Sequence, residues 1–282
     1  AAMAVLMSLS VISTQTYAQA TLEELDWAYA ISPPFPREED DGTVYSLPDS
    51  AGRFTLDEAR NRFGPADWYP QDHLPMPSIV AVGRESAGIM ACSLCHYPNG
   101  QGKPENASVV GLETEYFIQQ LQDMREGLRA SANTAKANTF MMIAFAEAMT
   151  DEEIKESAEY FGAMQWRQWI EVVEADTVPL SFRRGGLHIA LTGDEAGEEP
   201  IGRRIIEMPV DPEGTELLRN PRAGFRAFVP IGAIAAGEHL AETGGGKSVQ
   251  CSVCHGEQLE GLGQVPPLRG RSPSYLARQL FD

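Results

Sequence analysis

The chain has no long apolar run beyond its first residues, and it has few basic side chains. Its 282 residues include 22 Lys and Arg against 40 Asp and Glu, for a net charge of −18. Such an acidic chain disfavours nucleic acid and anionic membrane surfaces as partners, because both are polyanions. After residue 20 no segment is long and apolar enough to cross a bilayer, so the sequence predicts no transmembrane segment. The 43% apolar content predicts a folded globular chain.

Charge is absent from residues 1–20, which read AAMAVLMSLSVISTQTYAQA. The apolar run Ala4 to Val11 is too short to span a membrane, and Ala18-Gln19-Ala20 has the small-x-small pattern of a cleavage site. We interpret this segment as part of a secretory signal peptide without its basic region and initiating Met. A frayed apolar terminus is the alternative. No Cys follows the cleavage pattern, so a lipoprotein anchor is not indicated.

Cysteine is scarce, and none is left over: the four residues are Cys92, Cys95, Cys251 and Cys254. They form two C-x-x-C pairs, each followed at once by a histidine, namely His96 and His255. C-x-x-C-H is the attachment signature of haem c. Two thiols three residues apart lie on one side of a helical turn and reach the two vinyl groups of a porphyrin. The next imidazole then binds the iron, so we expect two haem c groups.

Two other sites use the same cysteines. A single zinc site would need the two pairs, about 155 residues apart, to come together. Two disulfides, redox-active or structural, would suit an exported chain. Neither accounts for a histidine after both pairs, so the haem interpretation is favoured.

The second motif belongs to a repeat. Residues 251–282 align without a gap to residues 92–123, and the second copy keeps Gly261, Gly270, Tyr275, Gln279 and Leu280 in register. The sequence ends at Asp282, before the counterparts of the later elements of the first copy. We expect the intact protein to continue for some 45 residues and to supply a sixth ligand to the second haem beyond Asp282.

Local patterns predict the elements around the first motif. We expect a helix over 82–96, a Gly- and Pro-rich loop over 97–111, and an amphipathic helix over 112–129. The apolar positions of that last helix are Tyr116, Phe117, Leu121 and Met124. Thr150 stands three residues before Glu153, which is a capping box at the start of a helix. Ile154, Ala158 and Phe161 follow on one face of it.

These strings together resemble the class I cytochrome c fold, and within it the dihaem cytochrome c4-like carriers of the bacterial periplasm. The resemblance depends on CSLCH, EYFIQQLQDMREGLR, TFMMIAFAEAMTDEEIKESAEYF, CSVCHGEQLEGLG and PPLRGRSPSYLARQLFD, which make up about a quarter of the chain. It implies a mainly α fold and a Met as the other axial ligand, upstream of the last helix. Met142 has the family spacing and Met141 is the alternate. Met124 and Met149 are expected in the core.

The resemblance also implies an outer partner for each iron-binding imidazole. Pro266 lies in the family's proline segment, where a backbone carbonyl orients the histidine, here His255. Ala107 stands at the same place in the first copy, which leaves the partner of His96 open.

Composition divides the chain into five segments. These are a partial signal peptide (1–20), a Pro-rich acidic leader expected to wrap the first haem domain (21–78), cytochrome c domain 1 (79–166), a β-rich connector (167–230) and an incomplete cytochrome c domain 2 (231–282). Short β-branched runs in the connector, WIEVVEADTVPLSF, GLHIAL, GRRIIEMPV and GFRAFVP, predict strands. His73, His188 and His239 are expected to be ordinary packing or surface residues, with His239 in a helix before the second motif.

The resulting hypothesis is an exported, periplasmic dihaem cytochrome without bond-making chemistry. His/Met ligation fills both axial positions, which suits electron transfer. Expected partners are periplasmic or membrane-bound redox proteins: a dehydrogenase, a bc1-type complex or a terminal oxidase. Two alternatives stay open. One is a haem enzyme of the dihaem peroxidase or thiosulfate-oxidising type, which needs an open iron, and the other is a cytochrome subunit dedicated to one dehydrogenase or oxidase.

Overall fold

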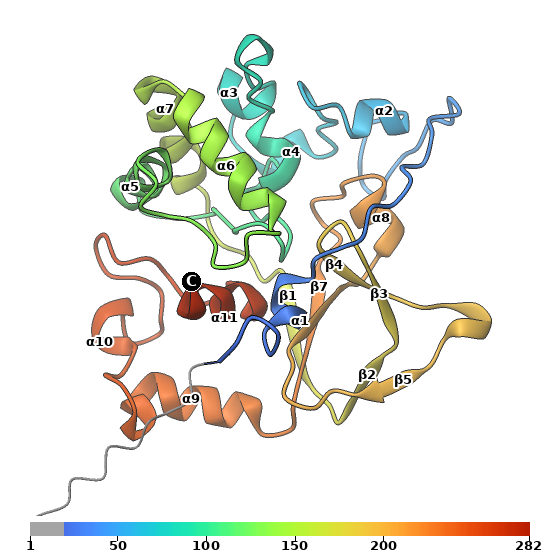
Figure 1. Cartoon of the computed structure of the whole chain (residues 1–282). Helices are drawn as coiled ribbons and strands as arrows, with labels where there is room; N and C mark the ends of the chain where they lie inside the picture. The colour runs from blue at the N-terminus through green and yellow to red at the C-terminus, as the bar shows by residue number, and fades with distance from the viewer. Residues whose placement is uncertain (1–19) are drawn as a thin grey trace, which may run out of the picture.

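The computed structural model describes residues 20–282, so the predicted signal peptide lies outside the described residues apart from Ala20. Helices and short strands share this part of the chain (Figure 1). The helices are α1 (Asp26–Tyr29), α2 (Leu56–Ala59), α3 (Ser78–Ala81), α4 (Cys92–His96), α5 (Thr114–Arg125), α6 (Ala137–Ala148), α7 (Asp151–Gly162), α8 (Pro212–Glu216), α9 (Ala233–Thr243), α10 (Ser252–His255) and α11 (Pro273–Phe281). Within residues 20–282 no helix is long and apolar enough to span a bilayer.

Helices α5, α6 and α7 form a body around one apolar core. Its buried residues come from the stretch between Ile79 and Phe161 and include Phe117, Leu121 and Ile154. The predicted apolar face of α5 is therefore confirmed. The predicted capping box is present too, because Thr150 accepts from the backbone of Glu153 and the Glu153 carboxylate accepts from the backbone of Thr150.

The predicted helix over 82–96 is wrong. Within this range only α4, at its end, is α-helical; α3 stops at Ala81, and Glu85–Ala87 form a single 3₁₀ turn. Gly83 and Gly88 both have positive φ, and an antiparallel bridge pairs Arg84 with Ile89 around this turn. A Cβ at Gly83 would lie 2.3 Å from the Ile89 carbonyl oxygen, so this tight reversal requires glycine.

The connector forms the predicted strands. They are β1 (Ile170–Glu174), β2 (Thr177–Pro179), β3 (Ser181–Arg184), β4 (Leu187–Ala190), β5 (Glu198–Pro200), β6 (Ile206–Pro209) and β7 (Phe225–Val229). The central strand β7 runs parallel to β1 and antiparallel to β6. Two antiparallel hairpin-like pairs, β2 with β5 and β3 with β4, complete this region.

The leader contacts both the connector and the first helical body. Its Trp68 indole donates to the Leu218 carbonyl of the connector at 2.6 Å, within a cluster of leader and connector residues. On the other side, the backbone amide of Ala91 donates to the Arg62 carbonyl at 2.9 Å. The leader thus joins the two regions, rather than wrapping the helical body alone as expected.

Helix α11 of the second repeat lies between the α5–α7 body and helices α9 and α10, beside α1 (Figure 1). Two buried arginines hold it there. Arg271 donates to the carbonyls of Ser108 and Val110 at 2.8 and 3.0 Å, and Arg278 donates to those of Ala28 and Pro104 at 2.5 and 2.6 Å. The second repeat is therefore packed into the first one and is not a separate globule in this structure.

The capping box makes a prediction for stability. Thr150→Ala removes the side-chain oxygen that accepts from the backbone of Glu153, and we expect the free energy of unfolding in urea to fall by about 1 kcal/mol. Thr192→Ala is the control, since Thr192 precedes a short 3₁₀ turn without any side-chain capping bond and is exposed. Equal losses in the two variants would contradict the role of the cap.

Candidate functional site

The two C-x-x-C-H motifs have the same local structure. The residue after each histidine has positive φ and extended ψ: Tyr97 at 62° and 157°, and Gly256 at 85° and 157°. The chain then turns back, so that the amide of Gly102 donates to His96 O at 2.9 Å, and that of Gly261 to His255 O at 2.8 Å. The sequence repeat is thus also a structural repeat.

A backbone carbonyl orients each histidine ring. Nδ1 of His255 lies 2.7 Å from the Pro266 carbonyl oxygen, as the resemblance implies. Nδ1 of His96 lies 2.8 Å from the Ala107 carbonyl oxygen, so the open question of its partner is answered without a proline. A carbonyl acceptor fixes the proton on Nδ1 and leaves Nε2 available to a metal. Burial lowers the pKa of His96, which keeps the imidazole neutral as a ligand must be.

A cavity of about 450 Å³ opens beside the first motif. Cys92, Cys95 and His96 line one side of it, while Met142 and Phe145 from α6 line another. Lining positions along α6 recur at steps of three and four residues, and this spacing defines one helical face. They are Asn138, Thr139, Met142 and Phe145, with Met149 just after the helix.

Four methionines line this cavity: Met90, Met124, Met142 and Met149. Met141, the alternate ligand, is not among its lining residues. Met149 is 6% exposed and belongs to the apolar core, with Met124 packed against that core, as expected from the sequence. Helix α6 itself did not follow from the sequence patterns, and it is the element that presents Met142 to the cavity.

The structure argues against the two alternative uses of the cysteines. Within residues 20–282 no group of three or more His, Cys, Asp or Glu side chains is placed to hold a metal ion, which removes the four-cysteine zinc site. Desolvation raises the pKa of Cys92 to about 12. A redox-active dithiol needs a lowered pKa, so this thiol has the wrong environment for disulfide exchange. All four thiols are free in the structure.

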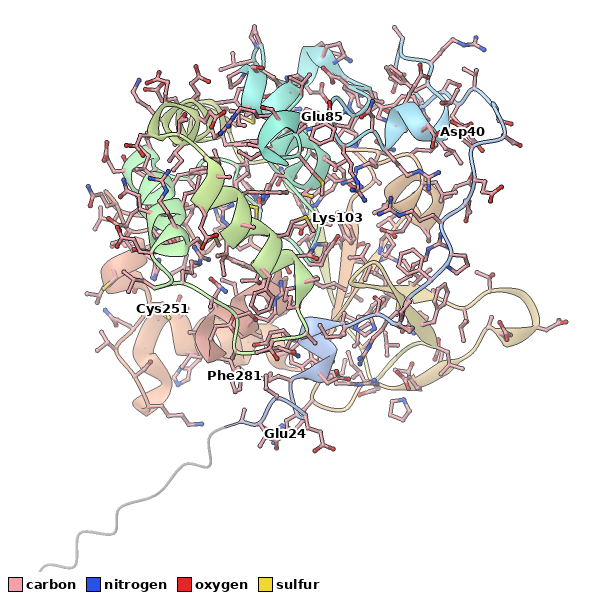
Figure 2. The ribbon with its side chains drawn as sticks, turned by 45° about the horizontal axis from the view of Figure 1, so that its top comes forward. Glu24, Asp40, Glu85, Lys103, Cys251 and Phe281 are labelled. Carbon is pink, nitrogen blue, oxygen red and sulfur yellow. The ribbon has the colours of Figure 1, made fainter. Side chains whose placement is uncertain are left out.

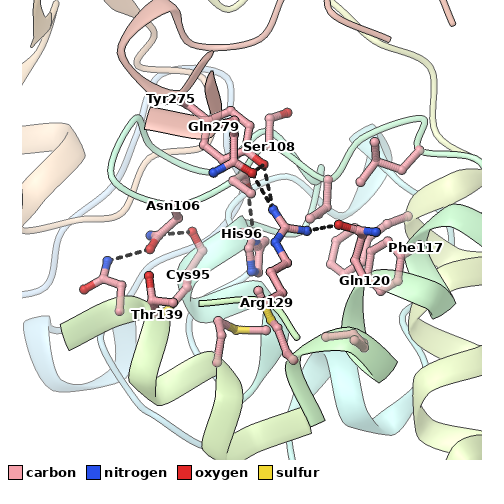
Figure 3. A pocket seen from close by; sticks show the side chains of 18 of the residues that line it. Cys95, His96, Asn106, Ser108, Phe117, Gln120, Arg129, Thr139, Tyr275 and Gln279 are labelled. Carbon is pink, nitrogen blue, oxygen red and sulfur yellow. Dashed lines mark hydrogen bonds between the residues drawn. The ribbon is translucent and has the colours of Figure 1, made fainter. Parts of the chain in front are cut away.

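The second repeat closes the cavity. Figure 3 shows Tyr275 and Gln279 of α11 facing Gln120 of α5, with Arg129 between them. Arg129 donates to Gln279 at 2.7 Å and to the Tyr275 hydroxyl at 3.2 Å, and it also donates to Gln120. Gln120 and Gln279 are equivalent positions of the repeat. The guanidinium of Arg129 therefore donates to the same glutamine position in each copy of the repeat.

The cavity lining is basic although the chain is acidic. Four cationic side chains, Arg129, Lys136, Arg271 and Arg278, stand against two carboxylates, Glu105 and Asp282. A haem c site needs two thiols for covalent attachment, an oriented imidazole for the iron, an apolar wall for the porphyrin and cations for its two propionate groups. All four are present in this cavity. The residues present thus fit haem c. The sequence patterns did not identify the four cations, because they come from two distant segments, one with Arg129 and Lys136 and the other with Arg271 and Arg278.

The second motif is more open. Cys251 is half-buried and Cys254 is exposed, and neither lines the cavity. His255 does line it, together with Pro266, Pro267 and Leu268.

The remaining histidines do not line the cavity, as expected from the sequence. His73 lies 3.1 Å from Asp67, and His188 is buried with Nε2 donating to the Trp27 carbonyl. His239 is on the exposed helix α9.

Gly102 provides a test of the carbonyl that orients His96. A Cβ at this residue would lie 3.0 Å from the Ala107 carbonyl oxygen. We expect Gly102→Ala to displace that carbonyl and to shift or broaden the Nδ1–H resonance of His96 in an NMR spectrum. Gly127→Ala is the control, because Gly127 also has positive φ but no neighbour within 4 Å of the added Cβ. An unchanged resonance in Gly102→Ala would show that the carbonyl is not held by this turn.

Comparison with known proteins identifies the first helical body. Residues 80–165 match the family model for cytochrome c. The chain is 30% identical over 116 residues to cytochrome c4 of Azotobacter vinelandii, covering 40% of this chain and 51% of that protein. It therefore spans about half the length of this relative.

Solved structures give partial similarities. A thiosulfate dehydrogenase (TsdBA) from Marichromatium purpuratum has a TM-score of 0.41 and 25% identity, over 70% of this chain and 30% of that one. Cytochrome c4 from Acidithiobacillus ferrooxidans has a TM-score of 0.41 and 18% identity, over 70% and 80% of the two chains. Cytochrome c4 from Pseudomonas stutzeri has a TM-score of 0.26 and 29% identity, over 29% and 43%. Residues 80–165 therefore match the cytochrome c family, and the chain is similar to cytochrome c4 over part of its length.

Proposed function

We propose that this c-type cytochrome carries electrons between redox proteins of the periplasm through two covalently attached haems. The observation that carries the proposal is the cavity in which Cys92, Cys95 and His96 face Met142. In that arrangement Cys92 and Cys95 would attach the porphyrin covalently, and His96 and Met142 would supply the ligands of its iron. Haem supplies the one-electron ferric–ferrous couple when bound.

The protein's own residues favour reversible electron transfer over substrate chemistry. The carbonyl of Ala107 accepts a hydrogen bond from Nδ1 of His96 and so holds the ring in one tautomer. In that tautomer Nε2 carries no proton. Two protein ligands leave the iron no position for a substrate. Phe145 and Phe161 line the apolar side of the cavity and exclude water from it.

The second C-x-x-C-H motif supports a second haem, held by Cys251, Cys254 and His255. Its histidine lines the same cavity as His96, and so do Tyr275 and Gln279 of α11, the helix that follows the second motif in sequence. Both repeats therefore contribute to one cavity, which supports electron exchange between the two motifs. Acidic surface charge suits docking partners with basic patches.

Replacing Met142 distinguishes an electron carrier from a haem enzyme. We expect Met142→Ala to lose the weak near-infrared band of Met-ligated ferric haem and to bind carbon monoxide when reduced. Met141→Ala is the matched control and should keep the band, because Met141 does not line the cavity. The spectra are recorded on chains matured with covalent haem.

Two results would contradict the proposed ligand. If Met142→Ala kept the near-infrared band, one of the other methionines that line the cavity, Met90, Met124 or Met149, would be the ligand. If the unmodified protein already bound carbon monoxide fully at two haems, the irons would be open and an enzyme would be the better description.

A further inference from the structure

Glu207 is a buried carboxyl group outside the haem site. It lies on β6 of the connector and is 3% exposed. Its Oε2 accepts hydrogen bonds from the Ser272 hydroxyl at 2.5 Å and the Ser274 backbone amide at 3.2 Å, and also from the Ser274 hydroxyl. Its Oε1 is buried and has no hydrogen-bond partner among residues 20–282. Burying a polar oxygen without a hydrogen bond costs free energy. Such an oxygen in a folded protein therefore indicates either a bound water molecule or a functional role.

The environment of Glu207 is a small polar cavity of about 10 Å³ between the connector, the leader and α11. This is about the room that one water molecule needs. Glu105 also lines this cavity, and its Oε2 is likewise buried without a partner. Two carboxyl groups with one free oxygen each therefore border a space in which a single proton-carrying water can bridge them.

Two side chains connect this small cavity to the haem cavity. Glu105 and Arg278 line both of them. Arg278 is 3% exposed and donates on one side to Ala28 of the leader and on the other to Pro104, next to Glu105. A change of charge in the haem cavity thus acts on Glu207 through a buried region, where solvent screening is weak.

We propose that Glu207 is a redox-linked proton site, which binds one proton from solvent when a one-electron donor reduces the haem in the adjoining cavity. The carboxylate becomes the carboxylic acid on reduction, and it returns the proton to solvent when a one-electron acceptor removes the electron. One electron and one proton enter together, so the buried region keeps its total charge. The proposal rests on the proposed function, since it needs haem in the cavity.

The charges around Glu207 give the sign of the effect. Burial raises the pKa of Glu207, while Arg278 from α11 favours its ionised form. Glu105 faces the same cavity from the loop and is paired with Lys103 at 2.9 Å. His188 faces it from β4, and burial lowers the pKa of His188, so this imidazole is neutral.

An added electron makes the surroundings more negative and raises the pKa of Glu207 further. At an effective dielectric constant of about 20, two unit charges roughly 12 Å apart alter proton affinity about tenfold. Between the oxidised-state and reduced-state pKa values, the haem therefore becomes harder to reduce as pH rises. Below and above that window the potential is independent of this proton.

The test is a spectroelectrochemical titration of the haem-loaded full chain at a series of pH values. We expect the equilibrium constant for reduction of one haem to fall by about tenfold in total as pH rises through the window. In Glu207→Gln the dependence should disappear while haem content stays unchanged. Glu195→Gln, an exposed residue of the same connector, is the control and should behave as the unmodified protein.

Lys136 is the competing group. It is 7% exposed, lines the haem cavity, and desolvation lowers its pKa to about 8. If Lys136→Gln removed the pH dependence and Glu207→Gln did not, the assignment to Glu207 would be overturned. A pH-independent potential in the unmodified protein would also overturn it, whereas the absence of covalent haem would instead defeat the proposed function.

A measurement on the unmodified protein tests the proposal even if Glu207→Gln does not fold. A reduced-minus-oxidised infrared difference spectrum of the unmodified protein should show the carbonyl band of a carboxylic acid appearing on reduction, with a shift in deuterium oxide. Proton uptake measured with a pH indicator should accompany it. No such band and no uptake at any pH would rule out a buried carboxyl group as the redox-linked site.

Discussion

Two buried guanidinium groups hold the structure together at its functional centre. Arg271 and Arg278 of the second repeat donate to four backbone carbonyls, three of them in the loop after the first motif and one in the leader. Hydrogen bonds from charged donors to buried carbonyls are among the stronger ones in proteins, and losing the donor leaves the acceptors unpaired. The cavity depends on this contact, because α11 forms one of its walls.

The connector supports the same contact from the other side. Glu207 accepts hydrogen bonds at the start of α11, and Glu216 of α8 forms a 2.9 Å ion pair with Lys103 of the haem loop. Figure 2 shows Lys103 near the middle of the view, whereas Glu24 lies at its lower edge, and the Lys103 side chain is only 8% exposed. The β-rich region is therefore more than a spacer: its carboxylates fix both the loop and the helix that surround the cavity.

Features that depend on neighbouring residues in the sequence could be predicted from it. The tertiary packing of distant segments could not. The C-x-x-C-H turns, the capping box at Thr150 and the strands of the connector depend on neighbouring residues, so their patterns were sufficient. The helix expected over 82–96 failed because two glycines with positive φ reverse the chain there. A helix pattern counts apolar spacing and gives too little weight to such turns.

The candidate site shows the same division. His96 was identified from its motif, but its acceptor, the carbonyl of Ala107, carries no side-chain signal and needed the folded loop. Arg129, Lys136 and Arg278 are scattered in sequence and meet only because α11 packs into the first repeat. Glu207 was one of several acidic residues in the connector, and its burial against α11 follows from tertiary packing alone.

The account requires that both motifs carry covalent haem, with the two copies sharing one cavity. The most direct measurement is the intact mass of the full chain, isolated from cells that attach haem c and denatured in acid to remove any group that is not covalently bound. The account predicts a chain heavier by two haem groups, each lost when the cysteine pair of its own motif is replaced by alanine. A chain with its unmodified mass, or one haem that persists when either pair is removed, would contradict it.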